Sequence, residues 1–248
     1  MLSSLLLSLF TFIVSIESQL YVSRRVENLR KEKKVNDQED ASLYDVVLYD
    51  IVHEKIYYPY FCKWSISAQD FFCKMLDVSI HVSIALVLFC GFFFHQDRDT
   101  GLAMSVTFAT FMKDYLNLLS IIFLVRSVSI NLTILPQCDF RSKKAVDEKD
   151  KSEGLKKVWK LLTMQSVEFG YKNDLLFSGH SAFLILSSLM IHHFTTIYYL
   201  LKIMIWIICI LLTLGFPCSM KHYTVDVLFA WITTLFIFQN YHNLLGKD

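Results

Sequence analysis

The fold is decided by residues 175–216, which read LLFSGHSAFLILSSLMIHHFTTIYYLLKIMIWIICILLTLGF. Two mostly apolar runs, 175–194 and 197–216, follow each other with only two threonines between them. A helix needs about 20 such residues to cross the hydrocarbon core of a bilayer. The stretch therefore predicts two membrane-spanning helices joined by a very short connection.

Four more segments have the composition of membrane spans. They are Met1–Leu20, Met75–Phe94, a part of 100–135 that ends near Pro136, and Val225–Tyr241. The first of them has an alternative reading as a signal sequence. The sequence thus predicts an all-α, polytopic membrane helix bundle with about six transmembrane helices. Its expected parts are a first helix or signal at 1–20, a polar loop at 21–70, and a membrane core that holds any catalytic site at 71–248.

The composition agrees with this class. Hydrophobic residues make up 54% of the 248 residues and charged residues 19%, against about 45–50% and about 25% in soluble domains. The 24 basic residues are matched by 23 acidic ones. We therefore expect a membrane partner and no nucleic-acid partner.

Counting spans shows which polar groups share a face of the membrane. The end of the third span and the starts of the fourth and sixth spans fall on one side. This side receives Arg126, Ser178-Gly179-His180-Ser181, and His222-Tyr223-Thr224-Val225-Asp226. Ionisable residues at the end of a membrane helix bundle are energetically unfavourable, so their presence indicates a functional site.

The spacing of these groups has chemical meaning. His222 and Asp226 are four residues apart, so on a helix the carboxylate can orient one imidazole nitrogen and leave the other as nucleophile or base. His180 is suited to protonating a leaving group. Ser178 and Gly179 would form a phosphate cradle at a helix N-terminus. A guanidinium at position 126 could clamp phosphoryl oxygens with paired hydrogen bonds.

Structural explanations remain open for some of these residues. Asp226 could merely cap the sixth helix, and Arg126 could reach toward the interface or pair with Asp114. Asp174 could be an acid favoured by a helix dipole instead of a substrate-binding residue. Isolated histidines at a membrane interface are usually anchors, and we assign this role to His53, His81, His95, His192, His193 and His242.

The motifs resemble those of the sphingomyelin synthase family. Residues 173–181, NDLLFSGHS, resemble its third signature, and His222-Tyr223-Thr224-Val225-Asp226-Val227, continuing to Tyr241-His242, is very similar to its fourth. Arg126 with Thr133-Ile134-Leu135-Pro136 is similar to the second, and Leu43-Tyr44-Asp45 is a weak echo of the first. The resemblance extends in order from about residue 42 to 243.

The resemblance implies a metal-independent phosphotransfer that needs no cofactor. A phosphatidylcholine or phosphatidylethanolamine donor would give its phosphorylated head group to His222, which Asp226 orients. His180 would protonate the departing diacylglycerol and then deprotonate ceramide. The implied partners are these lipids and the membrane; a homo-oligomer is possible.

Departures from the family pattern leave other functions open. Lys172-Asn173 stand where family members usually have Cys-Gly, so the head group could also be phosphoethanolamine or phosphoinositol. A lipid phosphate phosphatase would use the same histidines with water as acceptor. That class usually has a lysine seven residues before an Arg-Pro pair and an arginine six residues before the second histidine. This chain has no Arg-Pro pair, and Phe216 occupies the second position. A membrane scaffold that kept the fold is the third alternative.

Two signals disagree about membrane sidedness. The resemblance places the catalytic face in the Golgi lumen or outside the cell, in a protein of the Golgi, endoplasmic reticulum or plasma membrane. The loops on this face carry eight basic residues in 21–70 and nine in 141–172, which the positive-inside rule would assign to the cytosol. Because Asp and Glu are interspersed with them, we follow the resemblance and expect a lumenal or extracellular site.

Overall fold

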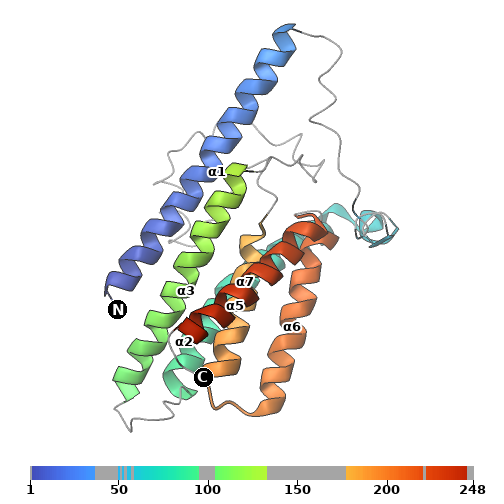
Figure 1. Cartoon of the computed structure of the whole chain (residues 1–248). Coiled ribbons are helices and arrows are strands. Elements are labelled where there is room, and N and C mark those ends of the chain that lie inside the picture. Colours follow the sequence, from blue (N-terminus) through green and yellow to red (C-terminus); the bar gives the residue numbers. More distant parts are fainter. Residues whose placement is uncertain are drawn as a thin grey trace.

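Six α-helices form a bundle in the computed structural model, which describes residues 2–36, 50, 52, 55–56, 59–94, 104–132, 177–219 and 222–244. The helices are α1 (Leu2–Asn36), α2 (Ile66–Phe94), α3 (Met104–Leu132), α5 (Gly179–Phe194), α6 (Tyr199–Cys218) and α7 (Thr224–Leu244), with a short 3-10 helix, η3, at Phe61–Lys63. The described residues contain no strand (Figure 1), which confirms the predicted all-α class.

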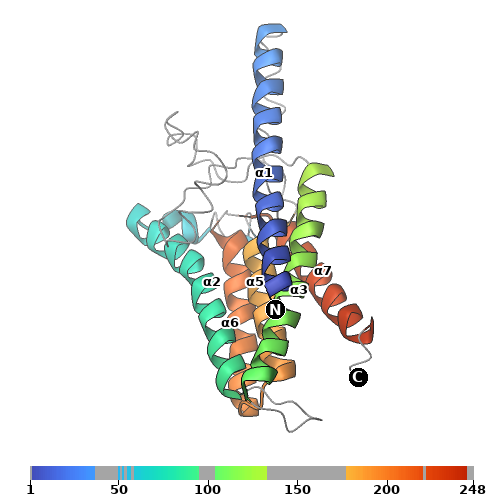
Figure 2. The ribbon, with the colours of Figure 1, turned by 90° about the vertical axis from the view of Figure 1, so that its left-hand side faces the viewer.

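Helix α1 packs along α3 in the same direction (Figure 2). The ring centroids of Phe12 and Phe123 are 5.0 Å apart, and three residues further along both helices Arg126 donates to Ser15. The buried face of α1 is a stripe of small polar side chains, Ser4, Ser8, Thr11 and Ser15. Small residues let two membrane helices approach closely, so this stripe sets the contact between α1 and α3.

Of the remaining helices, α2 and α7 lie parallel to α5, and α6 lies antiparallel to it. Asp77 of α2 lies beside His180 at the start of α5, and the carbonyl of Phe94 at the end of α2 accepts from the Thr196 N–H just after α5. Helices α2 and α5 are therefore parallel, with α6 returning between α5 and α7. The end of α3 and the starts of α5 and α7 consequently lie at one end of the bundle, as the span count predicts (Figure 1).

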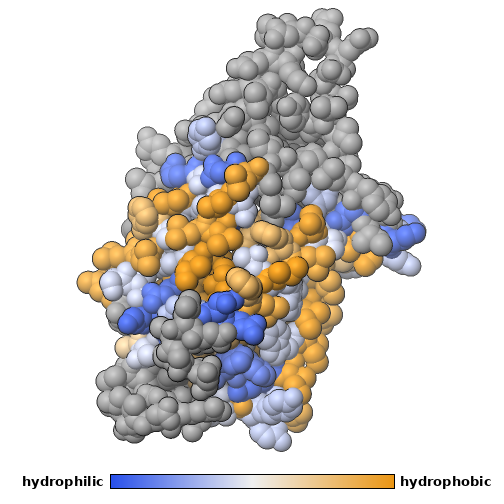
Figure 3. Space-filling view, viewed as in Figure 1, coloured by the Kyte–Doolittle hydropathy of each residue, from blue (hydrophilic) through white to orange (hydrophobic). Residues whose placement is uncertain are grey.

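Three described helical segments are long and apolar enough to cross a membrane: Ser67–Phe94, Phe108–Leu132 and Tyr199–Cys218. The apolar part of α1, Leu2–Ser18, is shorter. On the face seen in Figure 3, hydrophobic side chains cover the upper middle part and the flank formed by α6, and hydrophilic ones lie above and below this region. A helical membrane bundle is therefore supported, whereas a full span for α5 and α7 stays a prediction.

Several helix bounds differ from those predicted. Helix α1 continues to Asn36, through part of the segment expected to be a polar loop, because a charged sequence with few glycines or prolines can extend a helix into water. Helix α5 begins at Gly179, four residues after the expected start, because Ser178 caps it. At about 1.5 Å per residue its 16 residues extend about 24 Å. Most of its side chains from position 181 to 191 are buried, so α5 is the central helix of the bundle.

Gly91 allows α2 to approach α3 closely. A Cβ atom built at this position would lie 2.3 Å from Cε1 of Phe111, whose side chain is 1% exposed. The phenyl ring has no free space into which to move, because it belongs to the main hydrophobic core.

We expect Gly91→Ala to destabilise the bundle by about 1–3 kcal/mol, as overpacking does elsewhere, and to lower the melting temperature in detergent. Gly215→Ala is the comparison variant, because its Cβ would meet a methyl group of the buried Leu76 at 2.9 Å, a smaller overlap than the 2.3 Å at Gly91. Adding Phe111→Leu should restore part of the stability lost in Gly91→Ala. Equal melting temperatures for the two alanine variants would contradict this account of the α2–α3 contact.

Candidate active site

The site is built around the first turn of α7. Asp226, whose side chain is fully buried, accepts a hydrogen bond from the Tyr223 N–H on Oδ2 at 2.9 Å. An acid in the first turn that reaches back to the residue before the helix is half of a capping box. The same oxygen lies 3.6 Å from Nδ1 of His222. Asp226 therefore caps the helix and faces the imidazole at once.

His222 itself precedes α7 and is not part of it, which corrects the expectation that the two side chains share one face of a helix. Their proximity comes from the bend that leads into the helix. Ser219 closes the end of α6 by bonding to the carbonyls of Gly215 and Phe216. The Asp226 carboxylate, which caps α7, lies against the imidazole that precedes this helix.

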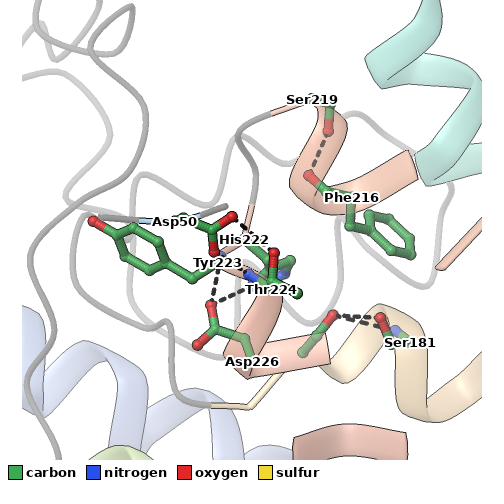
Figure 4. A network of polar contacts seen from close by, with 9 residues as sticks. Asp50, Ser181, Phe216, Ser219, His222, Tyr223, Thr224 and Asp226 are labelled. Atoms are coloured by element: carbon green, nitrogen blue, oxygen red, sulfur yellow. Dashed lines mark hydrogen bonds and ion pairs between the residues drawn. The ribbon is translucent and has the colours of Figure 1, made fainter. Parts of the chain in front are cut away.

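A second carboxylate approaches the start of α7 from outside it. Asp50, which is 7% exposed, accepts from the Thr224 N–H at 2.6 Å and from the Thr224 hydroxyl at 2.7 Å (Figure 4). Its Oδ1 also accepts from the Val52 N–H at 2.9 Å. Two carboxylates thus occupy the positive end of the α7 dipole, where negative charge is favoured.

The start of α5 is tied to the start of α7. Ser178 caps α5 by accepting from the Ser181 N–H at 3.3 Å and from the Ser181 hydroxyl at 2.9 Å. The Ser178 N–H donates to the carbonyl of Asp226 at 3.4 Å. Because Ser178 is fully buried and bonded in this way, it joins the start of α5 to the start of α7.

This junction brings the two histidines together. The ring centroids of His180 and His222 are 6.1 Å apart. The Phe216 ring lies 5.2 Å from the first and 6.1 Å from the second. The other neighbour of His180 is Asp77 on α2, whose Oδ1 is 3.5 Å from Nε2.

Arg126 lies over the start of α5. A Cβ atom added to Gly179 would be 3.1 Å from Nε of Arg126, so the guanidinium packs directly on the glycine. Its Nη1 donates to the Ser15 hydroxyl of α1 at 2.7 Å. Asp114, the alternative partner considered for this arginine, instead accepts from the Tyr241 hydroxyl. Helices α1, α3 and α5 therefore meet at the arginine.

The structure brings six of the seven expected site residues together: Arg126, Ser178, Gly179, His180, His222 and Asp226. Asp174, together with the motif residues 43–45 and 133–136, lies outside the described residues. Within the described ranges, no group of three or more His, Cys, Asp or Glu side chains is arranged to hold a metal ion.

The sequence reasoning missed Asp50, Asp77 and Ser15. A signal existed for Asp77, which is the one acidic residue in the apolar stretch 75–94. It also stands at the start of the second span, on the face that the span count assigns to the site. Asp50 is one of several acids in a mixed-charge segment, and Ser15 is one of several serines in α1, so neither is distinguished in the sequence.

The comparisons with known proteins bear on the second half of the chain. Residues 173–243 match the family model described as PAP2 superfamily C-terminal. The match spans less than a third of the chain and contains both histidines and Asp226. It supports the lipid phosphatase superfamily, and with it phosphatase or phosphotransferase chemistry on lipids, without reaching one family within it. The comparison with curated proteins finds no match.

We expect Asp50→Ala to loosen the start of α7, because it removes both acceptors of Thr224. Losing a helix cap costs about 1 kcal/mol, and bonds to a charged group contribute about 1.5–3 kcal/mol. The variant should melt at a lower temperature in detergent. Thr224→Val keeps the N–H bond and loses only the hydroxyl bond, so its effect should be smaller. An Asp50→Ala protein as stable as the parent would show that this contact contributes nothing.

Proposed function

We propose that the protein transfers a phosphorylated head group from a glycerophospholipid to ceramide through a phosphohistidine on His222. Phosphocholine or phosphoethanolamine is the transferred group, and the products are a sphingomyelin-type lipid and diacylglycerol. The observation that carries this proposal is the pair of imidazole rings 6.1 Å apart, with the Asp226 carboxylate 3.6 Å behind the second ring.

The burial of the two rings suits their different roles. The side chain of His222 is 11% exposed and that of His180 is 37% exposed. A sheltered imidazole, oriented by a buried carboxylate on Nδ1, is suited to attack phosphorus with its opposite nitrogen. The more open imidazole is suited to exchange protons with lipids that arrive and leave.

The start of α5 is the better place for the phosphoryl group. Asp226 and Asp50 accept hydrogen bonds from the backbone N–H groups at the start of α7. At the start of α5, Asp77 faces the His180 ring, no acid lies in the first turn, and Arg126 packs on Gly179. Helix N-termini and guanidinium groups both favour anions. Gly179 and Arg126 would therefore contact the phosphoryl oxygens, Ser178 would hold this turn in place, and Asp174 would contribute to substrate binding.

The reaction proceeds in two balanced steps. In the first, a His222 nitrogen forms a bond to phosphorus, the bond from phosphorus to the glycerol oxygen breaks, and protonated His180 gives its proton to that oxygen. Diacylglycerol leaves. In the second, neutral His180 takes the proton of the ceramide hydroxyl, the hydroxyl oxygen attacks phosphorus, and the bond to His222 breaks. Both histidines return to their starting states.

The charges at the site favour a phosphodiester over a phosphate monoester. A phosphate monoester carries about −1.5 to −2 charges near neutral pH, whereas a phosphodiester carries about −1. Phosphatases of the superfamily usually have an arginine where this chain has Phe216, and here its apolar ring lies beside both imidazoles. Among the described residues at the site, one guanidinium and an apolar wall suit a singly charged group and limit access of water, which supports transfer over hydrolysis.

The location of the activity follows from the same proposal. The site lies at the end of the bundle where α3 ends and where α5 and α7 begin. We propose that this end faces the lumen of the Golgi or endoplasmic reticulum, or the cell exterior. Its substrates would then be lipids of that leaflet.

The purified protein in vesicles, given fluorescent ceramide and phosphatidylcholine or phosphatidylethanolamine, should form a labelled phospholipid. His222→Ala should reduce this turnover to background without unfolding the bundle, because the variant lacks the nitrogen that would carry the phosphoryl group. Release of water-soluble phosphate from phosphatidic acid would instead identify a phosphatase, and no turnover of either lipid would indicate a scaffold. A His222→Ala variant with full activity would remove the mechanism.

We also expect Gly179→Ala to raise the KM for the donor lipid several-fold while kcat changes less, because the added methyl group would displace the guanidinium of Arg126. Arg126→Lys keeps the charge but loses the paired donors, and it should weaken the same step further. Ser15→Ala should have a smaller effect in the same direction. Unchanged KM values across this series would show that the arginine does not contact the donor.

A further inference from the structure

Asp77 is an acidic side chain at an unusual position. It lies on α2 at the start of the apolar stretch 75–94, where an ionisable group is costly unless it has a partner or a function. Its Oδ1 is 3.5 Å from Nε2 of His180, and its side chain is 51% exposed. Among the neighbouring exposed side chains of α2, Val78 and Met75 are apolar, whereas Lys74, one turn before Asp77, is basic.

Among the described residues, three helices place charged or titratable groups around His180. They are Asp77 from α2, Arg126 from α3, and His222 with Asp226 behind it from α7, whereas α6 contributes the Phe216 ring. Arg126 and a protonated His222 both oppose a positive charge on His180. Asp226 is directed to the other ring and to the Tyr223 N–H. Among the described residues, Asp77 is therefore the anion placed to favour protonated His180.

We propose that Asp77 is a positioning residue for His180, holding its ring through one nitrogen and favouring its protonated form. This inference rests on the proposed function, because His180 must carry a proton before the first step. The arrangement gives each imidazole its own carboxylate, Asp77 from α2 and Asp226 from α7. The proton moves from His180 to the departing glycerol oxygen and returns from the acceptor hydroxyl, and Asp77 stays ionised throughout.

The first test is the pH profile of kcat/KM for the donor lipid. Loss of the carboxylate in Asp77→Asn lets His180 lose its proton at lower pH, so the alkaline limb should move down by about 0.5 pH unit, the size expected for a half-exposed pair. Rates above that limb should fall about threefold. Asp77→Glu should restore the limb. The matched control is Asp70→Asn, an exposed carboxylate two turns earlier on α2.

A second test does not depend on activity. The imidazole C–H signals of the protein in detergent micelles are followed by NMR against pH, and His180 is assigned with a His180→Asn variant. The His180 titration midpoint should be lower in Asp77→Asn than in the parent and in Asp70→Asn. Equal midpoints in all three proteins would overturn the proposal even if the lipid is turned over. If the parent turns over no lipid, the proposed function fails, and the midpoints still decide whether Asp77 acts on His180.

Discussion

The site depends on one buried oxygen atom. Oδ2 of Asp226 accepts from the Tyr223 N–H and lies 3.6 Å from Nδ1 of His222. A buried carboxylate is strongly disfavoured unless its charge is compensated, and here the compensation comes from a helix N-terminus and an imidazole. The same oxygen atom of Asp226 therefore caps the N-terminus of α7 and orients the imidazole of His222.

A second constraint places the other histidine at the same level. The Ser178 N–H donates to the carbonyl of Asp226, so the starts of α5 and α7 are joined by backbone. Phe177, fully buried, packs on Phe229 one turn down α7, with centroids 5.9 Å apart. Helix α5 has 16 residues and is buried along most of its length. Its packing therefore leaves His180, in the first turn, little freedom to move along the bundle axis.

The sequence predicted the parts of this site that are local or that follow from counting spans. Polar groups at alternate span ends must share a face, so the meeting of Arg126, His180 and His222 needed no coordinates. Asp50 and Ser15 were missed because their roles arise from contacts between segments distant in sequence, such as the bond from Arg126 to α1, whereas Asp77 could have been found as an acid at the start of an apolar span. The length of α1 was missed for another reason: hydropathy locates a membrane span but does not indicate where its helix ends in water.

The exposure of the side chains forms a gradient through the site. Asp77 is about half exposed, His180 about a third, His222 about a tenth, and Asp226 not at all. Electrostatic interactions strengthen as water is excluded, so the Asp226 contact constrains its ring more than the Asp77 contact does. In the proposed mechanism, the group that forms and breaks a bond to phosphorus is at the sheltered end, where its orientation is held. The group that gains and loses a proton in every cycle is at the open end, where a weaker partner shifts its charge without holding it permanently.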